Sequence, residues 1–227
     1  KYDFVALASH QLRTPLSSMR WSFDVLMDTA ETLSDTQKRL MQNAYSAMMR
    51  MAETISTMLM VSRIDAESLR PAHEEFSMKE FLQGIQQDYS VQSQKKQITF
   101  STTCPDELTI HIDRNLLTEI VSNIVSNAIR YTPDGGTIEI AASANEKEIS
   151  IDIIDTGIGI PEDDQEKIFT KLFRAENAVL IDTNGTGLGL YVARGLIRLL
   201  GGDLSFTSAV SKGTTFTLRV PLTQETV

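Results

Sequence analysis

Apolar residues recur every three or four positions from residue 1 to about residue 70, which is the period of amphipathic helices. Two stripes follow one another along this segment. They run through Phe4, Ala8, Leu12, Leu16, Met19, Phe23 and Leu26, and then through Leu40, Ala44, Ala47, Met51, Ile55, Met58 and Ser62. Ser34 and Gln37 have the spacing of a capping box at the start of the second helix. The short connection over 29–34 therefore predicts an all-α, antiparallel helical hairpin.

Two helices alone cannot enclose an apolar core, so both stripes need a partner. The simplest partner is a second copy of the same hairpin. We therefore expect this segment to form a homodimer through a dimeric four-helix bundle.

The pattern changes after Leu69, where RPAHEEFS interrupts the helical period with a proline and clustered charges. We therefore predict one domain over 1–70 and a second over 71–227. Strands are predicted in the second domain over 97–103, 108–112, 137–144, 148–154, 203–208 and 214–220. Helices are predicted over 78–95, 114–131 and 187–200. This mixture predicts an α+β two-layer sandwich, with helices on one face of a mixed sheet.

Composition narrows the classes of function. The formal net charge of −9 argues against a nucleic-acid binder, which would carry a basic surface. A single cysteine, Cys104, excludes an internal disulfide framework. The sequence has no run of about 18 apolar residues and no signal-peptide pattern. The first residues, KYDFVALAS, already have helical periodicity without a preceding cap, so we expect the sequence to be part of a longer protein.

Glycine-bearing segments in the second half are candidates for ligand binding. DTGIGIP (155–161) follows an apolar strand and places an acidic residue at its end. NGTGLGL (184–190) precedes an amphipathic helix, whose free N–H groups and positive dipole end suit phosphate. Gly185, Gly187 and Gly189 do not have the G-x-G-x-x-G spacing, and the loop has no P-loop motif.

The predicted helix over 114–131 carries Asn123 and Asn127 on one face, with Glu119 one turn earlier. Asparagine is unfavourable inside helices unless its amide has a role. Oxygen ligands of this kind suit Mg²⁺, which also binds phosphates. In an alternative interpretation, the two amides only tie the helix to neighbouring loops.

His10 lies in the first predicted helix, close to Pro15. A proline inside a helix removes a backbone hydrogen bond, clashes with the carbonyl four residues back and costs about 3 kcal/mol. That carbonyl belongs to Gln11. We interpret Pro15 as softening the helix beside His10, and the alternative is a tolerated kink.

Five segments together resemble the sensor histidine kinases of bacterial two-component systems. SHQLRTPL resembles the H-box, and NIVSNAIRYTPDGG resembles the N-box. DTGIGIP, IFTKLFR and NGTGLGL are similar to the G1, F and G2 boxes. The order, the spacing and the division into two domains match over essentially the whole chain.

The resemblance implies a dimerisation and histidine phosphotransfer domain, followed by a catalytic ATP-binding domain of the Bergerat type. It implies a protein histidine kinase that uses ATP and Mg²⁺, autophosphorylates His10 and passes the phosphoryl group to an aspartate of a response regulator. It also implies a phosphatase activity on that regulator, in which Thr14 orients the attacking water.

The remaining site residues are also carried over from the resemblance. Asp155 would receive the adenine amino group, and Asn127 would hold Mg²⁺ with Asn123 nearby. Arg174 would reach the γ-phosphate during transfer, and 174–186 would form the mobile ATP lid. The other nucleotide-binding positions implied are Arg130, Tyr131, Gly157, Gly159, Gly185, Thr186, Gly187, Leu188 and Gly189.

Position 11 departs from the family pattern, in which an acidic residue commonly follows the histidine. An amide is not a base near neutrality, so Gln11 cannot accept the imidazole proton. Because general-base catalysis contributes about 10²–10⁴ in rate, we expect modest autophosphorylation.

Two other classes of function stay open. One is a Bergerat-fold ATPase that drives a conformational change, and the other is a nucleotide-binding dimeric scaffold without efficient phosphotransfer, which Gln11 favours. For the kinase we expect a cytoplasmic location, a cognate response regulator bound near 16–26 and the second helix, and membrane contact only through segments outside this chain.

Overall fold

The structure is a computed structural model that describes residues 19–26, 33–183 and 185–222. It divides into two compact units, Lys1–Leu69 and Arg70–Val227. His10, Gln11, Thr14 and Pro15 lie outside the described residues, so the predictions made for them stay predictions. Within the described ranges, no helix has the length and apolar character needed to cross a lipid bilayer.

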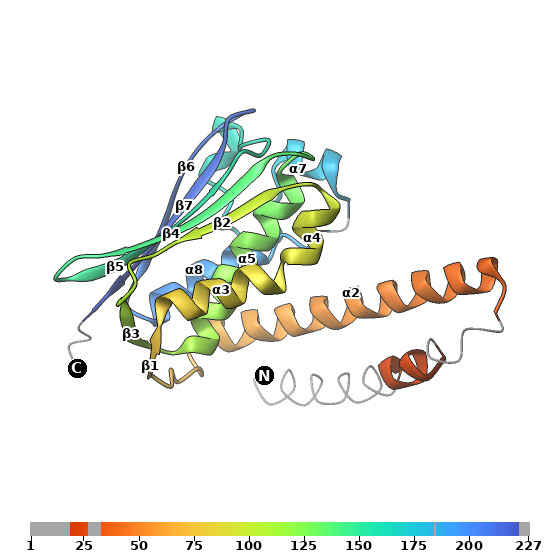
Figure 1. Ribbon diagram of the computed structural model, residues 1–227, viewed down its shortest axis with the longest axis horizontal. Coiled ribbons are helices and arrows are strands. Elements are labelled where there is room, and N and C mark those ends of the chain that lie inside the picture. Colours follow the sequence, from red (N-terminus) through yellow and green to blue (C-terminus); the bar gives the residue numbers. More distant parts are fainter. Residues whose placement is uncertain (1–18, 27–32, 184, 223–227) are drawn as a thin grey trace. The chain divides into compact units, whose positions relative to one another are not determined.

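The first unit contains a helical segment, residues 19–26, and the long helix α2 (Asp35–Asp65) (Figure 1). The Ser34 hydroxyl accepts a hydrogen bond from the Gln37 N–H at 3.3 Å, and Gln37 Oε1 accepts one from the Ser34 N–H at 2.9 Å. The predicted capping box is therefore confirmed. The ring centroids of Phe23 and Tyr45 lie 6.0 Å apart, so the two helices pack against each other.

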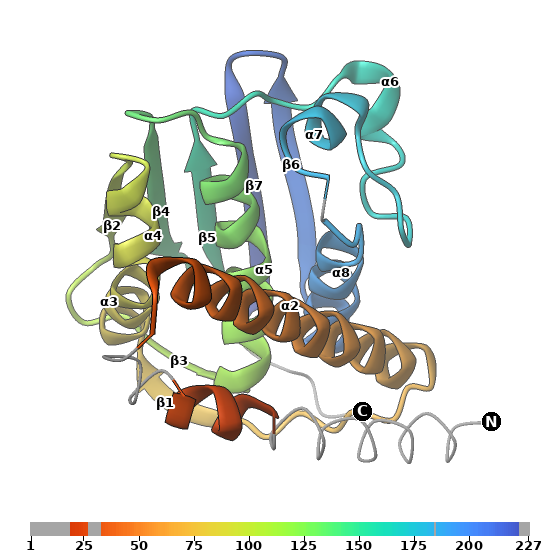
Figure 2. The same cartoon turned by 90° about the vertical axis from the view of Figure 1, so that its right-hand side faces the viewer.

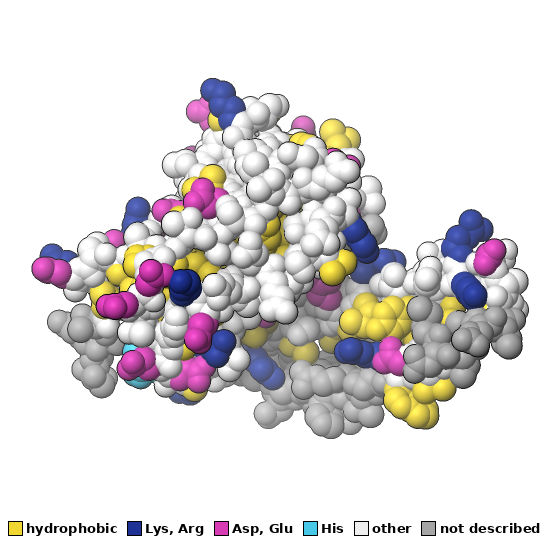
Figure 3. Space-filling model, in the orientation of Figure 1, with side chains coloured by type: hydrophobic (Ala, Val, Ile, Leu, Met, Phe, Trp, Pro, Cys, Tyr) yellow, Lys and Arg dark blue, Asp and Glu magenta, His cyan; other side chains and the backbone are white. Residues whose placement is uncertain are grey.

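Most of the apolar stripe of this unit faces solvent. Met48 is the one buried apolar side chain among the described residues before Leu69, whereas Trp21 is 70% exposed and Leu40 is 62% exposed. Figure 3 shows hydrophobic side chains gathered on this unit. Exposed apolar stripes need a partner surface, and the dimeric four-helix bundle stays the predicted one.

The second unit is built on a five-stranded sheet with the order β2-β4-β5-β7-β6. Its strands are β2 (Thr99–Thr103), β4 (Thr137–Ala144), β5 (Glu148–Asp155), β6 (Asp203–Ala209) and β7 (Gly213–Pro221). Only the β2–β4 pair is parallel, and the other neighbours are antiparallel. A separate two-stranded ribbon joins β1 (Glu74–Ser77) to β3 (Thr109–Ile112).

Helices cover one face of this sheet (Figure 2). They are α3 (Met78–Asp88), α4 (Ser90–Lys95), α5 (Arg114–Tyr131) and α8 (Gly189–Leu199). Two short helices, α6 (Glu162–Gln165) and α7 (Glu176–Ile181), lie between β5 and α8. The predicted two-layer α+β sandwich is therefore confirmed.

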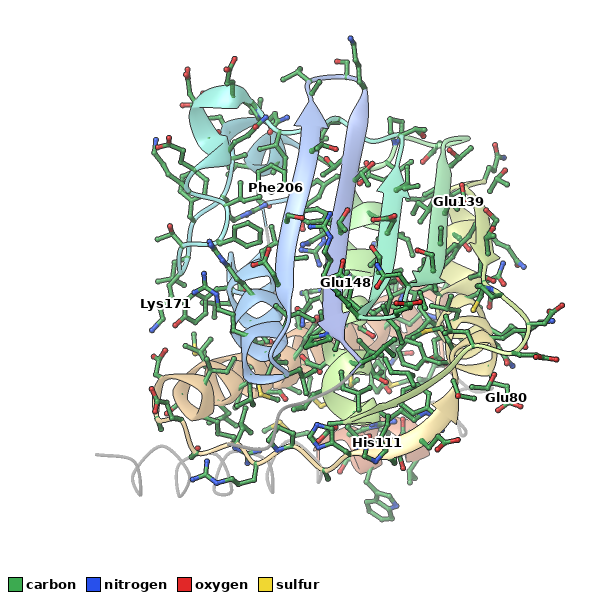
Figure 4. The ribbon with its side chains drawn as sticks, turned by 90° about the vertical axis from the view of Figure 1, so that its left-hand side faces the viewer. Glu80, His111, Glu139, Glu148, Lys171 and Phe206 are labelled. Carbon is green, nitrogen blue, oxygen red and sulfur yellow. The ribbon has the colours of Figure 1, made fainter. Side chains whose placement is uncertain are left out.

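The core follows from the two sequence periods. Alternate residues of β4 and β5 point to the helices and are fully buried, and among them are Ile138, Ile140, Ile151 and Ile153. Ile120 presents the apolar face of α5 to them. Figure 4 views the opposite face of the sheet, where polar side chains such as Glu139 and Glu148 lie.

Two local expectations were wrong. The predicted helix over 78–95 is two helices, because Tyr89 leaves helical geometry at φ −99° and ψ 3° and its hydroxyl donates to the carbonyl of Ser122 on α5 at 3.2 Å. No strand was predicted within RPAHEEFS, yet its last residues form β1. A four-residue strand has little periodicity of its own, and β1 depends on its pairing with β3.

A buried carboxylate joins the start of this unit to α5. Asp113 is the N-cap of α5, and its Oδ1 accepts a hydrogen bond from the Leu116 N–H at 2.9 Å. Its Oδ2 accepts a second one from the Ala72 N–H at 2.7 Å. Both oxygens of one side chain are therefore engaged.

Candidate functional site

The last turn of α5, the first turn of α8 and the end of β5 lie at the same end of the helix layer, near α7 (Figure 2). The apolar faces of α5 and α8 hold the two helices on the sheet, with Val121 and Val192 fully buried. The polar residues that the sequence singled out project from these termini.

Asp155 ends β5 and is only 8% exposed. Its Oδ1 accepts hydrogen bonds from the backbone N–H groups of Gly157, at 2.7 Å, and Thr214, at 3.2 Å. Burial raises the pKa of the Asp155 carboxyl, and these two backbone donors partly oppose the rise. A buried, oriented acceptor of this kind suits a ligand that donates an N–H group, such as the amino group of adenine.

Gly157 lies in close contact with the end of α5. A Cβ at this position would lie 2.6 Å from Asp155 Oδ1 and 2.9 Å from the carbonyl oxygen of Tyr131. The same Tyr131 carbonyl accepts a hydrogen bond from the Ile158 N–H at 3.2 Å. The loop after β5, which continues through Gly159 at φ +67°, is therefore fixed against the last turn of α5.

The last turn of α5 is held by Lys96. Its Nζ donates to the carbonyl oxygens of Ile129 at 2.8 Å, Arg130 at 3.1 Å and Thr132 at 2.5 Å. The last carbonyls of a helix lack partners within the helix, and a cation placed there satisfies them.

Asn123 and Asn127 lie one turn apart on α5 and are half-buried. The Asn123 Nδ2 donates to the carbonyl oxygen of Glu119 at 2.8 Å and to its Oε1 at 3.2 Å. This orientation turns Asn123 Oδ1 toward Gly189, where a Cβ would lie 2.8 Å from it. None of the described residues hydrogen bonds to the Asn127 side chain. These amide oxygens fit a Mg²⁺ ion that is also bound to phosphate.

Two arginines lie beside Gly185. A Cβ at position 185 would lie 3.0 Å from Arg174 Cζ and 3.2 Å from Arg130 Nη1. Arg130 Nη1 also lies 3.2 Å from Asp182 Oδ2. Arg130 and Arg174, which are 44 residues apart, therefore meet at one point through the fold.

The turn into α8 leaves its first N–H groups open to a ligand. Leu188 is the N-cap of α8, and no side chain in the described structure caps this terminus. Thr186 Oγ1 accepts from the Leu188 N–H at 3.4 Å. Gly187, at φ +67°, accepts from the Leu172 N–H at 3.0 Å. This turn is therefore bonded to the segment that precedes Arg174.

Aromatic contacts hold the segment before Arg174 on the sheet edge. The rings of Phe169 and Phe206 lie 5.8 Å apart, and Arg194 Cζ lies 4.6 Å from the Phe169 ring. Lys171 Nζ lies 4.8 Å from the Tyr191 ring on α8. Lys171 and Phe206 are labelled in Figure 4.

The structure thus brings the predicted residues into two groups, one around Asp155 and one around Gly185, and both border α5. It does not describe His10, Gln11 or Thr14.

Three residues that contribute to this site were not predicted from the sequence, namely Thr214, Lys96 and Asp182. Thr214 begins the predicted strand over 214–220, and Lys96 lies in no marked segment, so neither was singled out. Asp182 lies within the predicted lid over 174–186, but no role was assigned to it.

Two family models match the chain. The His Kinase A (phospho-acceptor) domain matches residues 1–67. The histidine kinase-, DNA gyrase B-, and HSP90-like ATPase matches residues 112–224. Among solved structures, full-length ShkA in complex with AMPPNP covers 100% of this chain and 47% of its own length, with a TM-score of 0.80. At 21% identity, this likeness shows the fold.

Curated relatives extend over both units. The sensor histidine kinase WalK of Bacillus subtilis (strain 168) is 33% identical over 226 residues, which are 98% of this chain and 37% of WalK. The sensor-like histidine kinase SenX3 of Mycolicibacterium smegmatis (strain ATCC 700084 / mc(2)155) is 32% identical over 219 residues, which are 96% of this chain and 57% of SenX3. The chain spans less than two thirds of the length of either relative. By these matches, it belongs to the sensor histidine kinase family.

Proposed function

We propose that this chain is the kinase part of a sensor histidine kinase, which autophosphorylates His10 from ATP and passes the phosphoryl group to an aspartate of a response regulator. The observation that carries the proposal is the convergence of Asp155, Asn127, Arg130 and Arg174 on one end of the helix layer. A family match to a phospho-acceptor domain over 1–67 supports the choice of His10.

The Asp155 side supports recognition of adenine. A carboxylate that is buried and fixed by two backbone N–H groups accepts a hydrogen bond from an amino group. Guanine presents a carbonyl oxygen where adenine has its amino group, so an acceptor at this point favours adenine.

The Gly185 side supports binding of the phosphates. Arg130 and Arg174 supply positive charge, and the turn at Thr186–Gly189 brings the first N–H groups of α8 close to them. Asn127, with Asn123 beside it, would hold Mg²⁺, which neutralises phosphate charge when it is bound. Phosphoryl transfer depends mainly on such positioning and charge.

In the transfer itself, the neutral imidazole of His10 uses a nitrogen lone pair to attack the γ-phosphorus. A P–N bond forms, the bond from phosphorus to the β–γ bridging oxygen breaks, and ADP leaves. The ring proton must then pass to a group other than Gln11, since an amide does not accept it. Slow autophosphorylation therefore belongs to the proposal.

The helical unit supports the proposed partners. Its exposed apolar stripe, which includes Leu40 and Met51, suits a homodimer through a four-helix bundle. The response regulator would bind near 16–26 and α2, and Thr14 would orient the water that removes its phosphate. The ATP-using part would face the cytoplasm, with any membrane contact made by segments beyond this chain.

The test is incubation of the chain with γ-labelled Mg·ATP. We expect acid-labile, base-stable label on the wild type, and none on His10→Ala or Asn127→Ala. His111→Ala and Asn115→Ala are the matched controls, because His111 is exposed on β3 and Asn115 is exposed at the far end of α5. Both controls should be labelled at the wild-type rate.

The same experiment separates the alternative functions. Release of labelled phosphate without labelled protein would favour the ATPase, and nucleotide binding without either product would favour the scaffold. A Gln11→Glu variant should label faster than the wild type by about tenfold or more. An unchanged rate would show that a base at position 11 does not limit this kinase.

A further inference from the structure

Helix α7 is bonded at both of its ends to parts of the proposed nucleotide site. At its first turn, the Asn177 Nδ2 donates to the carbonyl oxygen of Gly159 at 2.8 Å. The Glu176 N–H donates to Asp164 Oδ2 at 3.2 Å. This end of α7 is therefore tied to the segment that follows Asp155.

The other end of α7 is bonded to the two arginines. Arg174 Nη2 donates to the carbonyl oxygen of Ala178 at 3.3 Å and to that of Asp182. Arg130 forms an ion pair with the Asp182 carboxylate at 3.2 Å. The side chains of Arg130 and Asp182 are 37% and 20% exposed, so this pair is partly withdrawn from water.

These bonds use the same donors that the proposed function assigns to phosphate. A guanidinium has no acceptor atoms, and it binds carboxylates and phosphates through the same N–H groups. A phosphate oxygen can therefore reach Arg130 and Arg174 fully only if the end of α7 gives up those donors. Both arginines point at Gly185, which places the exchange at the turn that leads into α8.

We propose that the C-terminal end of α7, with the Asp182 carboxylate, is an internal competitor of the nucleotide phosphates for Arg130 and Arg174. The inference rests on the proposed function and adds a means of regulating the same site. Phosphate binding releases the Asp182 end of α7, while Asn177 keeps the other end tied to Gly159. Because part of the binding free energy is used to break the Asp182 contacts, the apparent affinity for nucleotide is lowered.

The competition is specific to phosphate, and this makes it testable. Asp182→Asn removes the negative charge and keeps the side-chain size. We expect it to bind the magnesium complex of AMPPNP about twofold to fivefold more tightly than the wild type, which is the range for loss of a partly exposed ion pair. Adenosine, which has no phosphate, should bind both proteins equally. Titration calorimetry on the full chain measures all four affinities.

Two further variants make the result specific. Asp182→Glu keeps the carboxylate and should return the AMPPNP affinity toward that of the wild type. Asp163→Asn makes the same charge change at an exposed position of α6 and should leave both affinities unchanged. Circular dichroism checks that each variant is folded.

Equal AMPPNP affinity in Asp182→Asn and the wild type would overturn the inference and leave the proposed function intact. The inference would also be overturned if Asp182→Asn raised the affinity for adenosine as much as the affinity for AMPPNP. The substitution would then have opened the site for every ligand. If no protein, the wild type included, binds AMPPNP, the proposed function fails and the inference fails with it.

Discussion

The two sides of the proposed nucleotide site are built in different ways. Around Asp155, the partners of the carboxylate are backbone N–H groups of Gly157 and Thr214, and the carboxylate itself is buried. Around Gly185, the charged groups are long side chains from α5 and from the segment before α7, and α7 holds both. The first side is complete before any ligand binds, and the second must exchange its partners.

This difference has a thermodynamic meaning. Binding to a preorganised group requires little free energy for rearrangement, because the partners of that group stay in place when the ligand binds. Arginines that are already bonded must first lose those bonds, so the net gain from phosphate is smaller than the gross attraction. The Asp155 side therefore suits recognition of the nucleotide, and the Gly185 side suits control of its reactive end.

Arg174→Ala should have the largest effect of these variants, and this effect should be confined to the Gly185 side of the site. We expect the rate of His10 labelling to fall by about 10²–10³, because removing a cation from the transferring phosphoryl group has effects of this order or larger. The affinity for adenosine should stay within about twofold, since Arg174 lies on the phosphate side. The control is Arg198→Ala, an exposed arginine in the last turn of α8. If Arg174→Ala is labelled at the wild-type rate, Arg174 does not have this role.

Asp155→Asn should weaken AMPPNP and adenosine alike, by about tenfold to a hundredfold, because a hydrogen bond to a charged acceptor contributes about 1.5–3 kcal/mol. The matched control is Asp152→Asn on the same strand, where the carboxylate accepts from Thr217 Oγ1 at 2.6 Å. Titration calorimetry compares the two. Weakening of AMPPNP without weakening of adenosine would place Asp155 on the phosphate side instead.

Lys96→Met should affect both sides at once, because the last turn of α5 carries Arg130 and contacts the loop after Asp155. We expect the free energy of unfolding to fall by about 1–3 kcal/mol, since three charge-assisted hydrogen bonds are lost. Denaturant titration measures this change against Lys95→Met, an exposed neighbour. Equal unfolding midpoints for the two variants would contradict the prediction.

The smallest expected effect is the pH dependence of stability. Burial raises the pKa of Asp155 in the folded protein above its value in the unfolded chain. The folded state therefore holds this proton more readily, and the stability that it gives is lost as the pH rises through the folded pKa. Near neutral pH, we expect Asp155→Asn to have a higher Tm than the wild type. This difference should narrow as the pH is lowered toward about 4. If the difference in Tm widens instead, folding lowers the pKa of Asp155 and does not raise it.

The strands of the large sheet were predictable where apolar and polar residues alternate, most clearly in β5 with its sequence EISIDIID. The predicted range 114–131 coincides with α5 for a related reason, since its apolar face is continuous and Asp113 caps it. Helix α7 was not predicted. It has only six residues, and its bonds to Gly159 and Arg174 are tertiary contacts that no local pattern reveals.

The same limit applies to the site. Asp155 and Gly157 stand in one short motif, so the sequence alone placed them together. Lys96 is 33 residues or more from the carbonyls that it binds, and Asp182 is 52 residues from Arg130, so only the fold brings them together. The roles of His10, Gln11 and Thr14 stay predictions.

The double use of Asp113 has a mechanical consequence. One oxygen fastens the backbone at Ala72, a few residues after the helical unit ends, and the other starts the helix that carries Asn123, Asn127 and Arg130. A pull on the chain at residue 72 is therefore resisted by the same carboxylate that anchors the first turn of α5. Tension in the connecting segment and the position of α5 are therefore linked through the side chain of Asp113.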